Sequence, residues 1–193
     1  MDDLFHPLRV EVFPESGLIA PEQSTNRTAR HLSDMRGMYQ DTQATEAMIA
    51  AADPLLYQLY SADIPDAVPH LLFGTTILYP GKVGNEYFMT RGHYHQVENT
   101  AEVYYCLRGS GYILMERRDG QVSAHALERG QTVYIPPGWA HRSVNVGDEE
   151  FVFFYAYPGG AGHDYEAFDA LGFRNLVVER EGQPAVVPNP RFG

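Results

Sequence analysis

Short β-rich runs separated by turn residues fill most of the chain from Leu71 to Tyr157. Glycine and proline punctuate them, as at Pro80-Gly81, Asp119-Gly120 and Pro136-Pro-Gly138. Evenly spaced short strands of this kind predict an all-β barrel or jelly roll. The expected strands are Phe73–Tyr79, Gly84–Thr90, Ala101–Leu107, Tyr112–Glu116, Val122–Leu127, Thr132–Ile135, His141–Val146 and Phe151–Tyr157.

One helix is expected before these strands. The stretch from Asp41 to Ala52 is rich in good helix formers, offers Asp41 or Thr42 as the N-cap, and meets Asp53-Pro54, which should end it. With 193 residues and 21.7 kDa, we expect a single domain. It would comprise an N-terminal extension (1–70) with the helix, a barrel core (71–160) and a C-terminal segment (161–193).

Composition narrows the class of protein. The net charge of −11 argues against nucleic acid as a partner, because phosphate backbones require a basic surface. No apolar stretch is long enough for a transmembrane helix, and residues 1–6 lack the pattern of a signal peptide, so we expect no membrane association and a cytoplasmic location. The single Cys106 excludes an internal disulfide and is expected in the core.

Three histidines and a glutamate form a candidate metal site. His93 and His95 stand two residues apart, so on a strand both side chains leave the same face. His141 follows a Pro-Pro-Gly turn, and Glu102 opens an apolar run. Such a set is typical of a divalent transition metal with open positions for substrate. Glu98 lies closer to His95, but we favour Glu102 because a strand position holds a ligand more rigidly than a loop position.

Strand alternation predicts which other side chains face the metal. If Glu102 points inward, Tyr104 and Cys106 do too, while Val103, Tyr105 and Leu107 face outward. The run 151–157 is apolar on both faces, so its outward aromatic residues must be buried against another part of the structure. We expect a homodimer to bury them; the alternative is that the N-terminal segment alone covers this face.

Two spacings resemble the cupin motifs. From Gly130 through Pro136, Gly138 and His141 to Asn145, every fixed position of the second motif is present. The first motif is matched by His93-x-His95 and by Glu102, but the six residues between His95 and Glu102 exceed the three or four usual in cupins. The resemblance implies a cupin jelly-roll β-barrel, here with an N-terminal extension containing one helix.

Longer strings around these motifs are similar to those of the cupin-type, metal-dependent glucose-6-phosphate isomerases found chiefly in archaea. The resemblance covers most of the chain and is carried by Thr75-Thr-Ile-Leu-Tyr-Pro-Gly-Lys-Val-Gly84, Met89-Thr-Arg-Gly-His93 and Ala161-Gly-His-Asp-Tyr165. It implies an enzyme that interconverts glucose 6-phosphate and fructose 6-phosphate.

Residue roles follow from the resemblance. It assigns the metal to His93, His95, Glu102 and His141, with Fe²⁺ the first choice and Mn²⁺, Ni²⁺, Co²⁺ or Zn²⁺ as alternatives. The remaining positions bind a phosphorylated hexose or act near its reactive end: for the sugar phosphate, Tyr57, Thr76, Thr90, Gly92 and Tyr165; for catalysis, Glu102, His163 and Tyr157. The role of Arg91 stays open, and His6, His31, His70 and His125 receive none.

The chemistry can follow two routes. Either a base, for which Glu102 is the candidate, removes a proton to give a cis-enediol, or the metal polarises the carbonyl and a hydride moves directly between C1 and C2. His163 or Tyr157 would move protons between oxygens or assist ring opening. Two other functions remain, an Fe(II) dioxygenase, since open metal positions also bind O₂, and a non-catalytic sugar-binding cupin.

Overall fold

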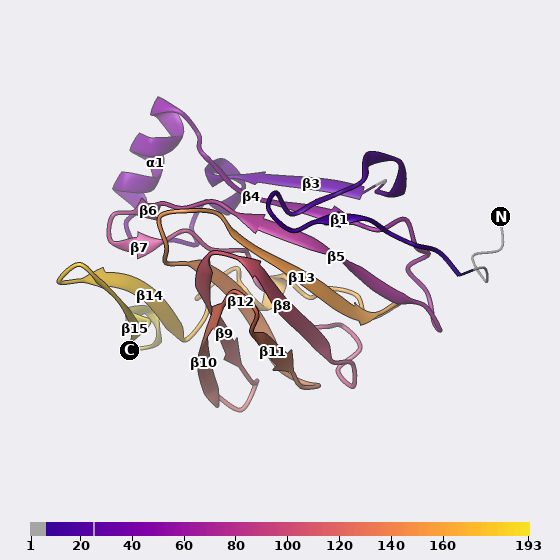
Figure 1. Cartoon of the computed structure of the whole chain (residues 1–193). Coiled ribbons are helices and arrows are strands. Elements are labelled where there is room, and N and C mark those ends of the chain that lie inside the picture. Colours follow the sequence, from indigo (N-terminus) through magenta and orange to yellow (C-terminus); the bar gives the residue numbers. More distant parts are fainter. Residues whose placement is uncertain (1–6, 25) are drawn as a thin grey trace.

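The computed structural model describes residues 7–24 and 26–193, which form antiparallel sheets (Figure 1). The largest sheet has six strands in the order β11-β8-β13-β5-β4-β3. Their bounds are β3 (Asn26–His31), β4 (Leu55–Ser61), β5 (Leu71–Leu78), β8 (Glu102–Arg108), β11 (Thr132–Ile135) and β13 (Phe151–Pro158). A three-stranded sheet packs against it, with β9 (Ser110–Glu116) between β10 (Val122–Glu128) and β12 (Ala140–Asn145).

Smaller elements complete the fold. A four-stranded sheet contains β6 (Lys82–Val83), β7 (Glu86–Tyr87), β14 (Asn175–Arg180) and β15 (Gln183–Pro188), and a hairpin joins β1 (Val12–Phe13) to β2 (Leu18–Ile19). Short 3₁₀ turns lie at Pro21–Gln23, Leu32–Met35, Glu166–Phe168 and Pro190–Phe192. Within the described ranges, no helix is long and apolar enough to span a bilayer.

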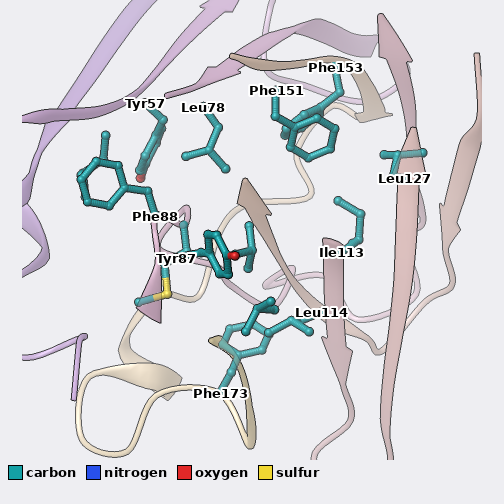
Figure 2. Close-up of a cluster of buried hydrophobic side chains, with 14 of the residues drawn as sticks. Tyr57, Leu78, Tyr87, Phe88, Ile113, Leu114, Leu127, Phe151, Phe153 and Phe173 are labelled. Atoms are coloured by element: carbon teal, nitrogen blue, oxygen red, sulfur yellow. The ribbon is translucent and has the colours of Figure 1, made fainter. Parts of the chain in front are cut away.

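The expected all-β jelly roll with a helix near its N-terminal end is confirmed. Within the described part of the chain, however, the hydrogen-bonded strands form separate sheets and do not close into one continuous barrel. The sheets face each other across an apolar core in which Ile113 of β9 lies toward Phe151 and Phe153 of β13, while Leu114 lies beside Phe173 (Figure 2). Cys106 is buried in this core, and burial raises the pKa of its thiol to about 11, which makes the thiol a packing group.

The helix α1 (Thr42–Ala51) forms where expected. Asp41 is its N-cap, because its Oδ1 accepts a hydrogen bond of 2.8 Å from the backbone N–H of Ala44. This contact satisfies one of the otherwise unpaired N–H groups at the helix start. The helix stops before Asp53, whose φ of 42° cannot continue it.

Most expected strands form, but one is wrong. Residues 84–90 do not form a continuous strand: β7 covers only Glu86–Tyr87, and Met89 makes a single bridge to Val144. The segment is instead divided between partners: Glu86–Tyr87 pairs with β6 and β14, and Met89 pairs with β12. A local β-pattern does not reveal such a change of partner.

Seven strands were not expected from the sequence: β1, β2, β3, β4, β6, β14 and β15. Of these, β4 matters most for the site, since it extends the six-stranded sheet beyond β5 and pairs Leu59 with Thr76. The polar strand β3 then pairs with β4 at the sheet edge. Its sequence, Asn-Arg-Thr-Ala-Arg-His, has no period-2 apolar pattern, so its extended form depends on the partner strand.

The outer face of the six-stranded sheet is partly covered by the chain itself. Gly17 of the β1–β2 hairpin lies so close that a Cβ there would come within 2.5 Å of Val152 and 2.9 Å of Ile77. The N-terminal segment therefore covers one end of this face. Farther along the sheet, Tyr105 and Tyr134 are exposed, as the alternation predicts for Tyr105.

Candidate metal centre and substrate cavity

Four side chains from three segments converge in the interior. One ligand atom from each of His93, His95, Glu102 and His141 lies within 4.8 Å of the others. Glu102 is central, with its Oε2 3.1 Å from Nε2 of His95 and 2.9 Å from Nε2 of His141. The side chains of Glu102 and His141 are 4% and 1% exposed, so water does not separate them.

Local backbone geometry delivers the histidines. His93 and His141 form an antiparallel bridge in which the N–H of His93 donates to the carbonyl of His141 and the reverse, at 3.2 and 3.1 Å. The bridge places the two imidazoles edge to face, with centroids 4.5 Å apart. His95 leaves the same side of the extended segment, and its ring stacks on His93 with centroids 5.7 Å apart.

The cluster fits a divalent cation. Nε2 of His93 and both ring nitrogens of His141 are buried without a well-aligned hydrogen bond, even though Nε2 of His141 lies 2.9 Å from Oε2 of Glu102. Buried polar groups are normally satisfied. Burial and the neighbouring imidazoles hold the pKa of His93 well below its usual range, so its ring is neutral, the form that binds a metal. Burial opposes ionisation of Glu102, but His141 and His95 outweigh it and set the pKa of its carboxyl at about 2. A carboxylate with three imidazoles suits a divalent transition metal.

The structure brings Glu102, and not Glu98, to the histidines. Glu98 lies in the turn between His95 and Glu102, its side chain is 70% exposed, and it pairs with Arg118 at 3.4 Å. Glu102 is the first residue of β8 and points inward with Tyr104 and Cys106, while Tyr105 points outward. Alternation along the strand therefore explains why Glu102 reaches the interior.

A cavity of about 230 Å³ opens beside the cluster. His93 and Glu102 form part of its wall, and the remaining lining is mostly hydroxyl-bearing: Thr28, Leu59, Ser61, Thr76, Tyr104, Tyr155, Tyr157, His163 and Tyr165. A smaller hollow of about 60 Å³ adjoins it and shares Thr76, His93 and Tyr165 with it. A larger hollow of about 740 Å³ around Arg108 and Glu149 contains none of the candidate site residues, so its size does not mark it as the site.

The smaller hollow contains all five positions that the resemblance assigns to the sugar phosphate. Tyr57, Thr76, Thr90, Gly92 and Tyr165 all line it. Oγ1 of Thr90 accepts a hydrogen bond of 3.0 Å from the backbone N–H of Ser143, which leaves the Thr90 hydroxyl hydrogen for a ligand. Burial raises the pKa of Tyr57 and of Tyr165, so both are neutral donors.

Known proteins are similar in sequence to this chain over most of its length. The family model for glucose-6-phosphate isomerase matches residues 29–188. The chain belongs to the glucose-6-phosphate isomerase family. It is 42% identical to the glucose-6-phosphate isomerase of Thermococcus litoralis over 96% of each chain, and 43% identical to that of Pyrococcus abyssi over 96% of this chain and 97% of the relative. The enzyme of Sinorhizobium medicae is 36% identical over 95% of this chain and 85% of the relative.

These matches confirm the family expected from the sequence and decide against the dioxygenase and sugar-binding alternatives. Among solved structures, a variant of Bacillus subtilis oxalate decarboxylase superposes with a TM-score of 0.45 and 21% identity, over 58% of this chain and 28% of that chain. A superposition this partial has no bearing on function.

The remaining residues that the isomerase resemblance singles out, His163 and Tyr157, line the cavity. The ring of His163 lies edge to face on His93, with centroids 4.4 Å apart, and stacks on Tyr165 at 5.7 Å. The ring of Tyr157 lies near those of His163 and His95, with centroid distances of 5.5 and 5.7 Å. Burial lowers the pKa of His163, although Glu102 opposes the shift, and burial raises the pKa of Tyr157.

Gly92 has a packing reason to be glycine in this isomerase, in addition to its expected place at the sugar phosphate. Its φ is +74°, and a Cβ would come within 2.6 Å of the Phe173 ring and 3.0 Å of Arg142. The packing of Phe173 and the backbone conformation therefore exclude a side chain here. Arg91, beside it, holds its guanidinium 5.1 Å from the centre of the Tyr165 ring and pairs with Asp169 at 2.7 Å.

Sequence reasoning missed several cavity residues of this isomerase family member. Tyr104 was expected to point inward but was given no role, and alternation along 102–106 was the signal that could have found it. Thr28 and Ser61 come from β3 and β4, for which no strand was expected. Within the described residues, His31, His70 and His125 lie outside the metal cluster, as expected, and His6 lies outside the described ranges.

Proposed function

We propose that this glucose-6-phosphate isomerase works with one divalent transition metal ion held by His93, His95, Glu102 and His141. The observation that supports it most strongly is the set of buried ring nitrogens without well-aligned hydrogen bonds, facing an ionised carboxylate. When bound, the ion would polarise the substrate carbonyl and stabilise negative charge that develops on the oxygens of C1 and C2. The adjoining cavity, about 230 Å³, gives the sugar a place beside it.

The phosphate of the substrate would lie in the smaller hollow. Thr76, Thr90, Tyr57 and Tyr165 offer neutral hydroxyl donors there, and several converging donors can bind a dianion. Neutral donors also suit a chain with a net charge of −11, whose overall field does not attract anions. These side chains would fix the distance between the phosphate and the metal, and so select a hexose phosphate of the right length.

His163 and Tyr157 would handle the protons. The lowered pKa of His163 keeps its imidazole neutral, with one ring nitrogen donating and the other accepting. The raised pKa of Tyr157 keeps its hydroxyl protonated. In the wall of the cavity, the two side chains can pass a proton to or from the sugar oxygens, which ring opening requires. Glu102 is the candidate base if the reaction follows the proton-transfer route.

Metal removal tests the proposal. The chelated protein, with its metal content measured by elemental analysis, should lose isomerase activity in an assay coupled to glucose-6-phosphate oxidation, and adding back Fe²⁺, Mn²⁺, Ni²⁺, Co²⁺ or Zn²⁺ should restore it. Fe²⁺ is our first choice. Full activity in protein free of metal would contradict the proposal.

The proposal extends to assembly and location. A cytoplasmic location is consistent with the single cysteine of the chain. A homodimer would cover the part of the six-stranded sheet where Tyr105 and Tyr134 are exposed. We further propose that 1–193 act as a single domain, since β3 and β4 of the N-terminal extension belong to the same sheet as β8 of the core. Sedimentation velocity tests the dimer: a species of twice the chain mass is expected, and a monomer at all concentrations would contradict it.

A further inference from the structure

The unusually long spacer between His95 and Glu102 carries a specific contact to the metal cluster. Residues 97–100 form a turn in which the backbone N–H of Thr100 donates to the carbonyl of Val97 at 3.2 Å. The side chain of Thr100 then lies back against His95. Its Oγ1 is 2.8 Å from Nδ1 of His95 and 2.6 Å from the carbonyl oxygen of Val97.

The direction of both hydrogen bonds follows from chemistry. A carbonyl oxygen only accepts, so the Thr100 hydroxyl must donate its hydrogen to Val97. The Thr100 oxygen can therefore only accept from His95, and Nδ1 of His95 must carry the hydrogen. In a neutral ring, Nε2 then has no hydrogen and presents a lone pair.

That lone pair faces the metal position. Nε2 of His95 lies 3.1 Å from Oε2 of Glu102, a carboxylate that is 4% exposed. Two acceptors facing each other at this distance require a cation between them, either a proton or a metal ion. The turn thus fixes His95 in the tautomer that binds a metal through Nε2.

His95 is distinct among the three histidines in this respect. Within residues 7–24 and 26–193, neither ring nitrogen of His141 has a well-aligned hydrogen bond, and no partner outside the cluster is found for the His93 ring. Only His95 has a ring nitrogen held from outside the cluster, by Thr100. Outer partners of this kind orient a ligand and raise its basicity.

We propose that Thr100 is a positioning residue that sets the tautomer and orientation of His95, and that the long spacer exists to deliver its hydroxyl. The inference rests on the proposed metal dependence. It predicts that Thr100 controls metal affinity without touching the substrate, and that a hydroxyl at this position is sufficient.

Metal affinity is the first test. The dissociation constant of a metal such as Co²⁺ or Zn²⁺ is measured by competition with a chromophoric chelator for the unaltered protein, Thr100→Val, Thr100→Ser and the control Thr132→Val. Thr132 is exposed on β11, where it pairs with Tyr105, and it is outside the site described above. Loss of the hydroxyl should weaken metal binding about 10- to 100-fold, as typical for removal of a ligand's outer partner. Thr100→Ser and Thr132→Val should bind like the unaltered protein.

A second measurement reads the protonation of the His95 ring directly and separates positioning from folding. In metal-free protein labelled with ¹⁵N at histidine, the His95 ring should show the hydrogen on Nδ1, and Thr100→Val should lose this preference. A predominant Nε2–H tautomer in the unaltered protein would overturn the inference, as would unchanged metal affinity in Thr100→Val, even if its melting temperature falls because the turn is weakened. If the unaltered protein itself binds no metal, the proposed function fails instead.

Discussion

Oε2 of Glu102 and Nε2 of His141 lie 2.9 Å apart, although their strands belong to different sheets. Glu102 begins β8 in the six-stranded sheet, and His141 lies on β12 at one edge of the three-stranded sheet. The candidate metal site therefore spans the interface between the two sheets. Any ion bound there would link the two halves of the core.

Metal binding should consequently stabilise the fold. A ligand that binds the native state alone adds about 2.7 kcal/mol at a concentration of 100 times its dissociation constant. Scanning calorimetry of chelated protein should show a higher melting temperature when a divalent transition metal is added. Mg²⁺, which prefers oxygen ligands, is the matched control and should have little effect. An equal shift with both ions would indicate nonspecific binding.

His141→Ala should abolish stable metal binding, because an incomplete ligand set holds a transition metal weakly. The matched control is His125→Ala, because His125 is exposed on β10 and its Nε2 lies 3.0 Å from Oγ of Ser123, outside the metal cluster. Elemental analysis after dialysis should find metal in the control and almost none in the His141 variant. Retention of metal and activity by His141→Ala would remove β12 from the site.

Glu102→Gln should nearly eliminate turnover, while Glu98→Gln should leave it unchanged. The first substitution keeps the size of the side chain but removes the charge that faces the imidazoles. The second affects an exposed side chain that pairs with Arg118 at the surface. Steady-state kinetics with excess metal separates the two carboxylates, and the opposite pattern would show that Glu98 moves into the site.

Thr90→Val should raise KM for the phosphorylated sugar and leave metal affinity intact. A hydrogen bond to a charged group contributes about 1.5–3 kcal/mol, so an increase of about 10- to 100-fold is expected. Thr90→Ser keeps the hydroxyl and is the control. Because the Ser143 N–H also loses its acceptor, kinetics should be measured well below the melting temperature. A change in metal affinity without a change in KM would place Thr90 among the metal-supporting residues instead.

Gly92→Ala should destabilise the protein more than Gly130→Ala. Both glycines have positive φ, at 74° and 85°, but a Cβ at Gly130 meets nothing within 4 Å. Gly130→Ala should thus cost only the conformational penalty of about 1–2 kcal/mol. Gly92→Ala adds a clash with Phe173 and Arg142, for which overpacking costs about a further 1–3 kcal/mol. Chemical denaturation measures both, and equal losses would show that Phe173 moves aside.

Local sequence patterns were sufficient for much of the fold and for the metal cluster. The His93-x-His95 spacing, the turn before His141 and the alternation of Glu102 with Tyr104 each depend on a few neighbouring residues. Their side-chain directions follow from the two-residue period of extended chain. The cap at Asp41 is equally local, since its partner Ala44 lies within the first helical turn.

The sequence by itself thus determined the β-rich architecture, the single helix and the residues that meet at the cluster. Only the tertiary structure decided which residues line the cavity. The strands β3 and β4 bring Thr28 and Ser61 to it, and the separation into sheets places Glu102 against His141. Thr100 reaches His95 through a turn that no hydrophobic periodicity of the sequence predicts. Strand pairing and the docking of turns depend on partners distant in sequence and on competition between alternative sheet edges. A local sequence pattern therefore does not specify them. The packed core selects one arrangement.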